Sequence, residues 1–231
     1  MKGPSAPAFP VPRALSPSHQ RVGPPLGGAG AAVLGYPVLK RLLDVVLCLL
    51  ALPVVLPVLL LCGAAVRLDS PGPIVFSQLR TGRHGRRFRI YKFRTMCRDA
   101  EEQKAGLAHL NILPPPDFKI IDDPRITRAG RFLRATSLDE VPQLWNVLCG
   151  DMTLVGPRPT SFTASTYDLW HTARLEVRPG LTGLWQVHGR NRSDFDERLR
   201  MDIEYIRTMC LRRDVMLIVQ TVSSVAHRRG A

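Results

Sequence analysis

Residues 42–66 read LLDVVLCLLALPVVLPVLLLCGAAV, a run of 25 residues in which Asp44 is the only charge. A run of this length and apolarity predicts a helix inserted in a membrane. Pro53 and Pro57 stand in its middle, where each removes a backbone donor and bends a helix. A buried helix of a soluble protein is a poor alternative, because such helices are rarely apolar on every face over this length.

Basic residues flank this run on both sides, with Lys40 and Arg41 before it and Arg67 after it. Positive charge marks cytoplasmic flanks, so both ends are easiest to place on the cytoplasmic side. A helix broken at Pro53 would then enter one leaflet and return. We therefore expect residues 42–66 to form a re-entrant helix, and the alternative is a single span with a proline kink.

Composition divides the chain into a tail and one domain. Residues 1–36 are rich in Pro, Gly and Ala, which predicts a disordered tail, and residues 37–231 suffice for one domain. Five cysteines without a CxxC pair predict free thiols. Lys and Arg outnumber Asp and Glu by 32 to 19, a net charge of +13. That charge favours phosphates, anionic lipids or nucleic acid as partners, without choosing among them.

The apolar run is followed by patterns of both strands and helices. GPIVFSQ (72–78) and RRFRIYKFRT (86–95) predict a β-hairpin around the turn TGRHG. A short basic helix is expected before residue 136, and another helix over residues 164–176. Residues 211–229 suit a membrane surface or packing against the core, and the pattern favours neither. The expected fold is α+β: a mostly helical monotopic membrane protein with a re-entrant hydrophobic helix, a small β-hairpin and amphipathic interfacial helices.

The hairpin is strongly basic and carries no acidic residue between Gln78 and Arg98. Directly after a membrane segment, such a cluster is expected among anionic headgroups or phosphates, and the alternative is a solvated basic face. The eight basic residues are Arg80, Arg83, Arg86, Arg87, Arg89, Lys92, Arg94 and Arg98.

The densest group of candidate catalytic residues surrounds the adjacent acids Asp139 and Glu140. Successive helical residues point about 100° apart, so one carboxylate can face a reacting phosphorus while the other holds a cation. Mg²⁺ bound by one or two carboxylates plus substrate phosphates is the expected arrangement, which makes both acids predicted metal ligands. Arg134 and Arg158 would give planar contacts to the same phosphates.

The same acids have a structural interpretation. Ser137 precedes Glu140 by three residues, which is a capping box, and by itself this motif is more often a cap than a catalytic site. The flanking arginines, the Gly-Pro-Arg-Pro turn at residues 156–159 and the upstream membrane segment favour the catalytic interpretation.

A second group lies in RPGLTGLWQVHGR (178–190), where Gln186 and Arg190 stand among glycines in a plausible phosphate- or sugar-contacting loop. Asp194 and Asp196 form a D-x-D pattern, a metal motif in many glycosyltransferases. We interpret these two as helix-start residues, because the chain lacks the alternating strands and helices of a nucleotide-binding sheet. P-loop, H-E-x-x-H and G-x-S-x-G motifs are missing from the sequence.

Together these motifs resemble the bacterial sugar transferase family, the monotopic polyprenyl-phosphate phosphoglycosyl transferases. The chain resembles the compact form, without the multi-span N-terminal domain of larger members. The matching motifs run in order over residues 37–231: FxQxRxG (76–82), YKFRTM (91–96), SLDExPQ (137–143), WNVL (145–148), GDM (150–152), VGPRP (155–159), VRPGLTG (177–183), QV (186–187) and GR (189–190).

The resemblance implies a reaction. A phosphosugar is transferred from a UDP-sugar to polyprenyl (undecaprenyl) phosphate with release of UMP, the first membrane step of surface-glycan assembly. Asp139 matches the nucleophile that forms a covalent aspartyl-phosphosugar, assisted by Glu140 and Mg²⁺. Phosphate- or nucleotide-binding positions are matched by Arg134, Pro157, Arg158 and Pro159. The helix break matches Leu52 and Pro53, with Leu52 where the family often has serine.

The resemblance also implies a location and partners. The chain is expected in the bacterial cytoplasmic (inner) membrane, with its catalytic domain on the cytoplasmic face and among anionic membrane lipids. Nucleic acid is not an expected partner, and a homo-oligomer is allowed. Two alternatives stay open: a non-catalytic basic protein of membrane surfaces or nucleic acid, and a D-x-D glycosyltransferase that releases UDP. Neither the sugar nor the glycan pathway is indicated by any motif.

Overall fold

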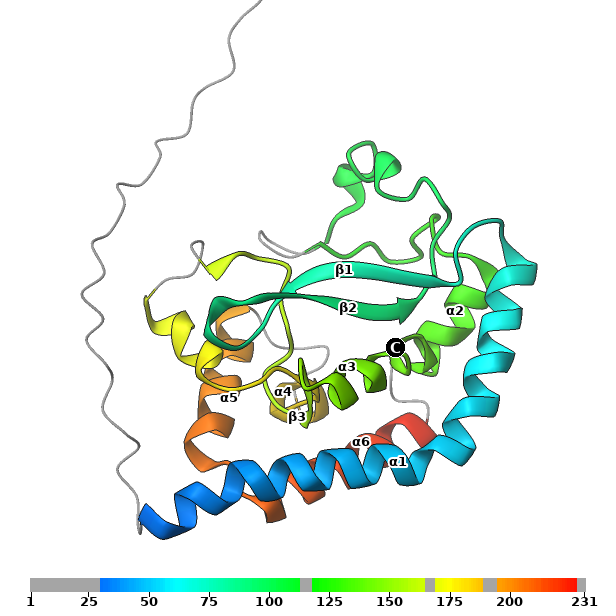
Figure 1. The fold of residues 1–231 in the computed structure, drawn as a ribbon. Helices are drawn as coiled ribbons and strands as arrows, with labels where there is room; N and C mark the ends of the chain where they lie inside the picture. Colours follow the sequence, from blue (N-terminus) through cyan, green and yellow to red (C-terminus); the bar gives the residue numbers. More distant parts are fainter. Residues whose placement is uncertain (1–29, 113–117, 165–168, 189–194, 228–231) are drawn as a thin grey trace, which may run out of the picture.

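The computed structural model describes residues 30–112, 118–164, 169–188 and 195–227 (Figure 1). This part of the chain is mostly helical and contains two small two-stranded sheets, so the predicted α+β class is confirmed. The elements in chain order are α1 (Gly30–Asp69), β1 (Val75–Thr81), η1 (Arg83–Gly85), β2 (Arg87–Phe93), η2 (Glu102–Lys104), η3 (Ala108–Leu110), α2 (Arg128–Ala135), η4 (Leu138–Glu140), α3 (Gln143–Cys149), β3 (Thr153–Val155), η6 (Leu169–Glu176), β4 (Gly180–Thr182), α4 (Leu184–His188), α5 (Phe195–Thr208) and α6 (Leu211–Ala226).

Helix α1 is one long helix whose two arms meet at a sharp bend (Figure 1). The bend lies between its dark-blue and cyan parts, the region of the sequence that contains Leu52, Pro53 and Pro57. We call residues 30–52 the N-terminal arm and residues 53–69 the C-terminal arm. A bend here follows from the prolines, each of which removes a hydrogen bond and crowds the preceding turn.

By length and composition α1 could cross a membrane. Residues 35–69 have a mean hydropathy of 3.1 in their most apolar 18-residue window, of which only 11% is buried. A core helix of a soluble protein would be mostly buried, so this exposure is compatible with a membrane location.

The first helix begins ahead of the predicted domain boundary. Helix α1 begins at Gly30, and Tyr36, assigned to the tail in the sequence analysis, donates a hydrogen bond to Asp214. A partner distant in sequence thus holds Tyr36 in place, and the division between tail and domain near residue 36 stays a prediction. Residues 1–29 lie outside the described part.

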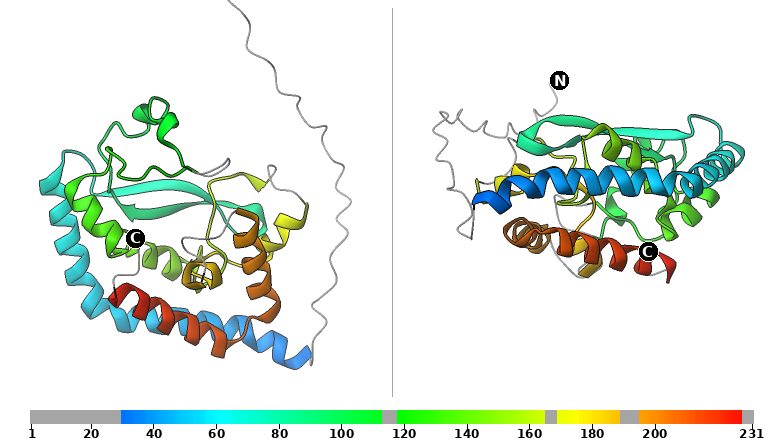
Figure 2. Two further views of the ribbon diagram at one scale, coloured as in Figure 1. Left: turned by 180° about the vertical axis from the view of Figure 1, so that it is seen from behind. Right: turned by 60° about the horizontal axis from the view of Figure 1, so that its bottom comes forward.

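The N-terminal arm of α1 and helix α6 lie side by side (Figures 1 and 2) and place polar groups inward. Asp44 and Asp214 are 2% and 0% exposed. Apolar side chains point outward from the same helices, namely Leu42, Val46, Leu49, Leu50, Val215, Met216, Val219 and Val222. This is the reverse of a helix that faces water and is typical of helices that face lipid.

The sequence did not decide whether α6 packs against the core or lies on a membrane surface. In the structure one side of α6 packs against the core, and the other side is exposed. Leu217 is fully buried in a cluster with Val155, Leu184 and Tyr205. The Thr221 hydroxyl lies 2.7 Å from that of Thr182. The opposite side of α6 is exposed and apolar.

The predicted hairpin is confirmed, with β1 antiparallel to β2 from the pair Val75–Phe93 to the pair Thr81–Arg87. Its β2 strand packs on α3, where Phe88 and Ile90 meet Val147 and Met152 in one core cluster. Fully buried Asn146 locks the two elements together: its Oδ1 accepts from Tyr91 N (3.1 Å), and its Nδ2 donates to the Arg89 carbonyl (2.7 Å).

The interpretation of the basic cluster as a solvated face is wrong for several members. Arg94 is buried and donates to the Ser70 carbonyl (2.6 Å) beyond the end of α1. Arg87 donates to Thr81 and to the Ser161 carbonyl. Arg41 lies outside this cluster, directly before the apolar run of α1, and it donates to the Val147 carbonyl at the end of α3. These arginines donate to backbone carbonyl groups instead of standing free in solvent.

Two of the predicted helices are present in different forms. The basic helix is α2, whose N-cap Thr127 accepts from Gly130 N. The helix expected over residues 164–176 is a 3₁₀ segment at Leu169–Glu176, and residues 165–168 fall outside the described ranges. Asp196 lies in the first turn of α5, as interpreted, whereas Asp194 belongs to an undescribed gap.

Candidate active site

Asp139 and Glu140 lie in η4, a single 3₁₀ turn between α2 and α3. The alternative interpretation of Ser137 and Glu140 as a capping box is wrong. Ser137 has a left-handed backbone (φ 57°) and makes no side-chain cap, whereas an N-cap residue normally has an extended backbone. Because α2 ends at Ala135, Ser137 serves as the turning residue into η4. A non-glycine residue in this conformation is uncommon and is often found at functional sites.

Two cations from different parts of the chain hold Glu140. Lys92 of β2 lies 2.7 Å from its Oε1, and Arg158, in the loop after β3, donates to both carboxylate oxygens, with Nη1 3.1 Å from Oε2. The Glu140 side chain is 18% exposed. Burial alone would raise its pKa, but the charges of Arg158 and Lys92 outweigh this effect and lower the pKa of Glu140 below its usual value.

Asp139 differs from Glu140 both in its contacts and in the direction of its pKa shift. Within the described residues no hydrogen bond or ion pair reaches its carboxylate. Burial raises its pKa, the neighbouring Glu140 adds to this, and the charges of Lys92, Arg134 and Arg158 oppose it. A half-buried carboxylate with a raised pKa, beside several cations, marks a candidate functional group.

Arg134 lies in the last turn of α2, where its Nε donates to Thr95 Oγ1 (2.9 Å). Burial lowers the pKa of Arg134, and the charge of Asp139 counteracts that effect. The structure thus brings Arg134, Asp139, Glu140 and Arg158 together, as the sequence predicted.

Backbone hydrogen bonds hold the loop that carries Arg158 against strand β4. Gly156 N donates to the Thr182 carbonyl (2.9 Å), and Gly180 N donates to the Pro157 carbonyl (2.8 Å). A Cβ on Gly180 would lie 2.1 Å from Gly156 N, so only glycine permits this approach. Pro157 and Pro159 are both buried beside Arg158 and line a small cavity with it. Both prolines therefore help to position the loop, and their contact with phosphate or nucleotide stays a prediction.

The buried ion pair between Arg174 and Asp202, which the sequence analysis missed, contacts the backbone of Arg158. Arg174 donates from Nη2 to the Arg158 carbonyl (2.5 Å) and to Asp202 Oδ2 (2.7 Å). Asp202 is 1% exposed, and burial raises its pKa to about 6 against the opposing charge of Arg174. The available signal was its position in α5, where it shares the buried face with Leu199 and Tyr205.

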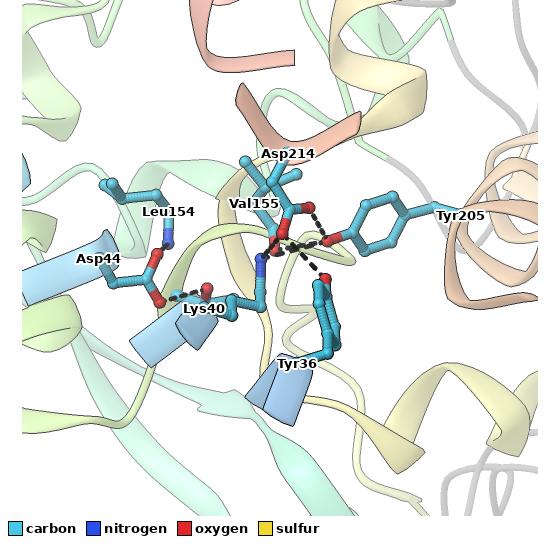
Figure 3. A network of polar contacts seen from close by, with 8 residues as sticks. Tyr36, Lys40, Asp44, Leu154, Val155, Tyr205 and Asp214 are labelled. Atoms are coloured by element: carbon cyan, nitrogen blue, oxygen red, sulfur yellow. Dashed lines mark hydrogen bonds and ion pairs between the residues drawn. The ribbon is translucent and has the colours of Figure 1, made fainter. Parts of the chain in front are cut away.

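The N-terminal arm of α1 is hydrogen-bonded to β3, the strand that precedes Arg158 (Figure 3). Asp44 accepts from Thr153 Oγ1 (2.6 Å) and from Leu154 N (3.0 Å) in β3. Tyr205 OH lies 3.1 Å from the carbonyl oxygen of Val155, the last residue of β3. The helix that carries the apolar run therefore also positions the loop of the candidate site.

The same close-up shows a buried network around Asp214 (Figure 3). Tyr36 OH donates to its Oδ2 (2.8 Å), and Lys40 Nζ lies 2.9 Å from the same atom. Tyr205 OH lies 2.6 Å from Oδ1. Lys40, predicted as a membrane flank, is therefore bound inside the protein, a role that the sequence analysis missed.

The residues predicted to contact phosphate or sugar in the second loop are Gln186 and Arg190. Gln186 is buried, and its Nε2 donates to the Leu181 carbonyl (3.0 Å). Its Oε1 has no partner among the described residues. No hydrogen bond in that part of the chain joins Gln186 to the Glu140 cluster, so its contact with phosphate stays a prediction. Arg190 lies in the undescribed residues 189–194.

The part of the chain that the structure describes has no group of three or more His, Cys, Asp or Glu side chains arranged around a metal. Mg²⁺ needs fewer protein ligands when substrate phosphates and water complete its shell. Asp139, whose carboxylate bonds to none of the described residues, and Glu140 fit that smaller donor set. Binding of Mg²⁺ stays a prediction.

Comparison with known proteins completes the description. A model of the family described as "Bacterial sugar transferase" matches residues 35–228. The chain is 44% identical over 196 residues to the galactosyl transferase CpsE of Streptococcus agalactiae, covering 83% of this chain and 43% of the relative. It is 43% identical over 198 residues to the undecaprenyl-phosphate galactose phosphotransferase of Salmonella typhimurium, covering 84% and 41%.

A third relative is the UDP-glucose:undecaprenyl-phosphate glucose-1-phosphate transferase of Caulobacter vibrioides, 43% identical over 199 residues, with 80% of this chain and 69% of the relative covered. The chain thus spans less than half the length of the first two relatives and about two thirds of the third.

Proposed function

The chain belongs to the bacterial sugar transferase family, and on that premise we propose that it transfers a phosphosugar from a UDP-sugar to polyprenyl (undecaprenyl) phosphate and releases UMP. The names of the Salmonella and Caulobacter relatives support this reaction. The observation that carries the proposal is the contrast within η4, where no described residue bonds to the Asp139 carboxylate while Lys92 and Arg158 hold Glu140.

In the proposed mechanism Asp139 is the nucleophile. A carboxylate oxygen forms a bond to the phosphorus linked to the sugar, and the bond from that phosphorus to the UMP oxygen breaks, with UMP keeping the electron pair. An oxygen of the lipid phosphate then attacks the same phosphorus and displaces Asp139. The product is a polyprenyl-diphosphate sugar, and the enzyme returns to its first state.

The surrounding residues stabilise charge during both steps. Arg134, Lys92 and Arg158 surround the two carboxylates with positive charge, which favours approach of the anionic diphosphate. Glu140, held by two cations, keeps Arg158 directed at the site. Mg²⁺ bound by Asp139 and Glu140 would neutralise charge on the diphosphate oxygens.

The proposed location is the cytoplasmic face of the bacterial inner membrane, with α1 re-entrant. The bent α1 and the outward-facing apolar residues of α1 and α6 support it. Val38 and Leu68 are exposed on the two arms, so Val38→Cys and Leu68→Cys test the topology. A membrane-impermeant thiol reagent should label both only from the cytoplasmic side. Labelling from opposite sides would instead indicate a single span.

The reaction is tested by incubating the membrane-embedded protein with a panel of UDP-sugars and undecaprenyl phosphate. Release of UMP together with a lipid-diphosphate sugar supports the proposal. Release of UDP would favour the D-x-D glycosyltransferase. Absence of both nucleotides over the whole panel would favour the non-catalytic basic protein. Success with one sugar would place the chain at the first membrane step of a surface glycan.

A further inference from the structure

An apolar groove of about 410 Å³ lies between the C-terminal arm of α1 and helix α2. The α1 side is formed by Val58, Leu61, Cys62 and Ala65, and the α2 side includes Phe132 and Leu133. Every lining residue, all from the described ranges, is aliphatic, aromatic or a cysteine. Such a groove offers nothing to a nucleotide or a free sugar, because both would leave polar groups without partners.

The groove ends at the candidate active site. Leu138 belongs to its lining and is followed directly by Asp139. On α2, Leu133 lines the groove, and the next residue, Arg134, acts electrostatically on Asp139. Along both η4 and α2 the surface therefore changes from wholly apolar to charged within one residue.

We propose that this groove holds the first isoprenoid units of the acceptor lipid and thereby brings its phosphate to Asp139. The inference rests on the proposed function. A polyprenyl phosphate joins its phosphate directly to a hydrocarbon chain, so the lipid itself changes from apolar to charged without a spacer. That boundary matches the step from Leu138 to Asp139.

An ordinary membrane phospholipid is the competing occupant. It carries glycerol esters between its acyl chains and its phosphate, and these polar groups would meet Leu133 and Leu138 rather than water or donors. The exposed side of Leu61 and Phe132 leaves the groove open along its length. The remainder of a long isoprenoid chain can thus continue into the membrane.

The test uses two alanines that are neighbours on α1. Ala65 lines the groove, whereas Ala64 is exposed and lies outside the lining. Ala65→Phe should fill part of the groove and lower kcat/KM for undecaprenyl phosphate by about 10-fold or more, the scale of hydrophobic-pocket discrimination. Ala64→Phe adds the same ring one residue away and should leave this value near that of the unmodified protein. Equal acceptor kinetics in the two variants would overturn the proposal.

A second readout separates this inference from the proposed function. UMP released in a single turnover without acceptor reports the first step only, so Ala65→Phe should retain it. Absence of that UMP from the unmodified protein, with every UDP-sugar, would reject the proposed function itself. Its loss in Ala65→Phe alone would show that the ring acts on the site directly rather than on acceptor binding, and would count against the groove.

Photo-crosslinking provides a measurement that needs no variant. A polyprenyl phosphate with a photoreactive group on its first isoprene unit should label peptides that contain residues of the groove. Unlabelled undecaprenyl phosphate should suppress the labelling, and excess phosphatidylglycerol should not. Equal suppression by phosphatidylglycerol, or labelling confined to the outer face of α6, would contradict the proposal.

Discussion

The carboxylates of Asp139 and Asp214 differ in the hydrogen bonds that the described residues provide. Asp214 is fully buried, and Tyr36, Lys40 and Tyr205 engage its oxygens. Asp139 is half-buried, and the described residues provide it with no hydrogen bond. A buried charge without partners costs stability, so the first arrangement maintains the fold and the second preserves reactivity. The two acids thus differ in burial and in the number of groups that bond to them.

The largest effect expected from this contrast is on turnover. Asp139→Asn removes the nucleophile and should lower kcat by about 10³-fold or more. Because the pKa of Asp139 is raised, the folded state favours protonated Asp139 at low pH, and ionised Asp139 reduces stability at neutral pH. The melting temperature of Asp139→Asn at pH 7 should therefore equal or exceed that of the unmodified protein. Full activity, or a large drop in melting temperature, would refute the assignment.

The mirror experiment is Asp214→Asn, which should affect stability rather than chemistry. Removing one partner of a buried ion pair costs about 3–5 kcal/mol, since Lys40 loses its charged partner and one of the two acceptor oxygens that the tyrosine hydroxyls and Lys40 share becomes an N–H donor. Thermal unfolding in lipid nanodiscs measures the loss, and Asp151→Asn, at an exposed acid, serves as the matched control. Activity of the folded fraction should persist. If Asp214→Asn lost activity but kept its melting temperature, Asp214 would have a role in the reaction rather than in stability.

A smaller effect is expected from Arg158→Lys. The charge is kept, but the paired contacts to both oxygens of Glu140 are lost. A charge-assisted hydrogen bond contributes about 1.5–3 kcal/mol, so kcat/KM for the UDP-sugar should fall roughly 10- to 100-fold. Arg131→Lys, at an exposed position on α2, is the control. Unchanged kinetics in Arg158→Lys would show that a point charge suffices.

The finest test concerns the pH dependence of Asp139. Its pKa is raised, so activity should fall on the acid side at a pH above the ordinary aspartate pKa of 3.8. Lys92 is the foremost charge that opposes this rise. Lys92→Gln should therefore move the acid limb of the kcat/KM profile to higher pH, whereas Arg89→Gln, at an exposed residue of β2, should not. An unshifted limb in Lys92→Gln would exclude Lys92 as the controlling charge.

Local patterns predicted much of the fold. The apolar run with Pro53 and Pro57 is a long bent helix, and the alternating residues on either side of TGRHG form a hairpin. The pattern around Ser137 was ambiguous. The same residues, Ser137 to Glu140, can form a capping box or a 3₁₀ turn that follows a left-handed residue, and the structure contains the turn. The basic cluster was misleading, since charge alone does not show that Arg94 is buried against Ser70.

The candidate site was predicted in part. Asp139, Glu140, Arg134 and Arg158 are close enough in sequence to form one motif, and the structure brings them together. Lys92 was visible only as one basic residue among many, although it is a direct partner of Glu140. Its 48-residue separation from Glu140 is spanned by β2, α2 and the intervening loops, which leave no local signal.

The sequence by itself determined the long apolar helix, the hairpin and the identity of the two adjacent acids, because these depend on neighbours along the chain. Only the tertiary structure decided which acid would be bound and which left open. The partners of Glu140 come from 48 and 18 residues away, and Tyr36 lies 178 residues from Asp214. Folding places those donors, and the free energy of a buried charge depends on the donors that reach it.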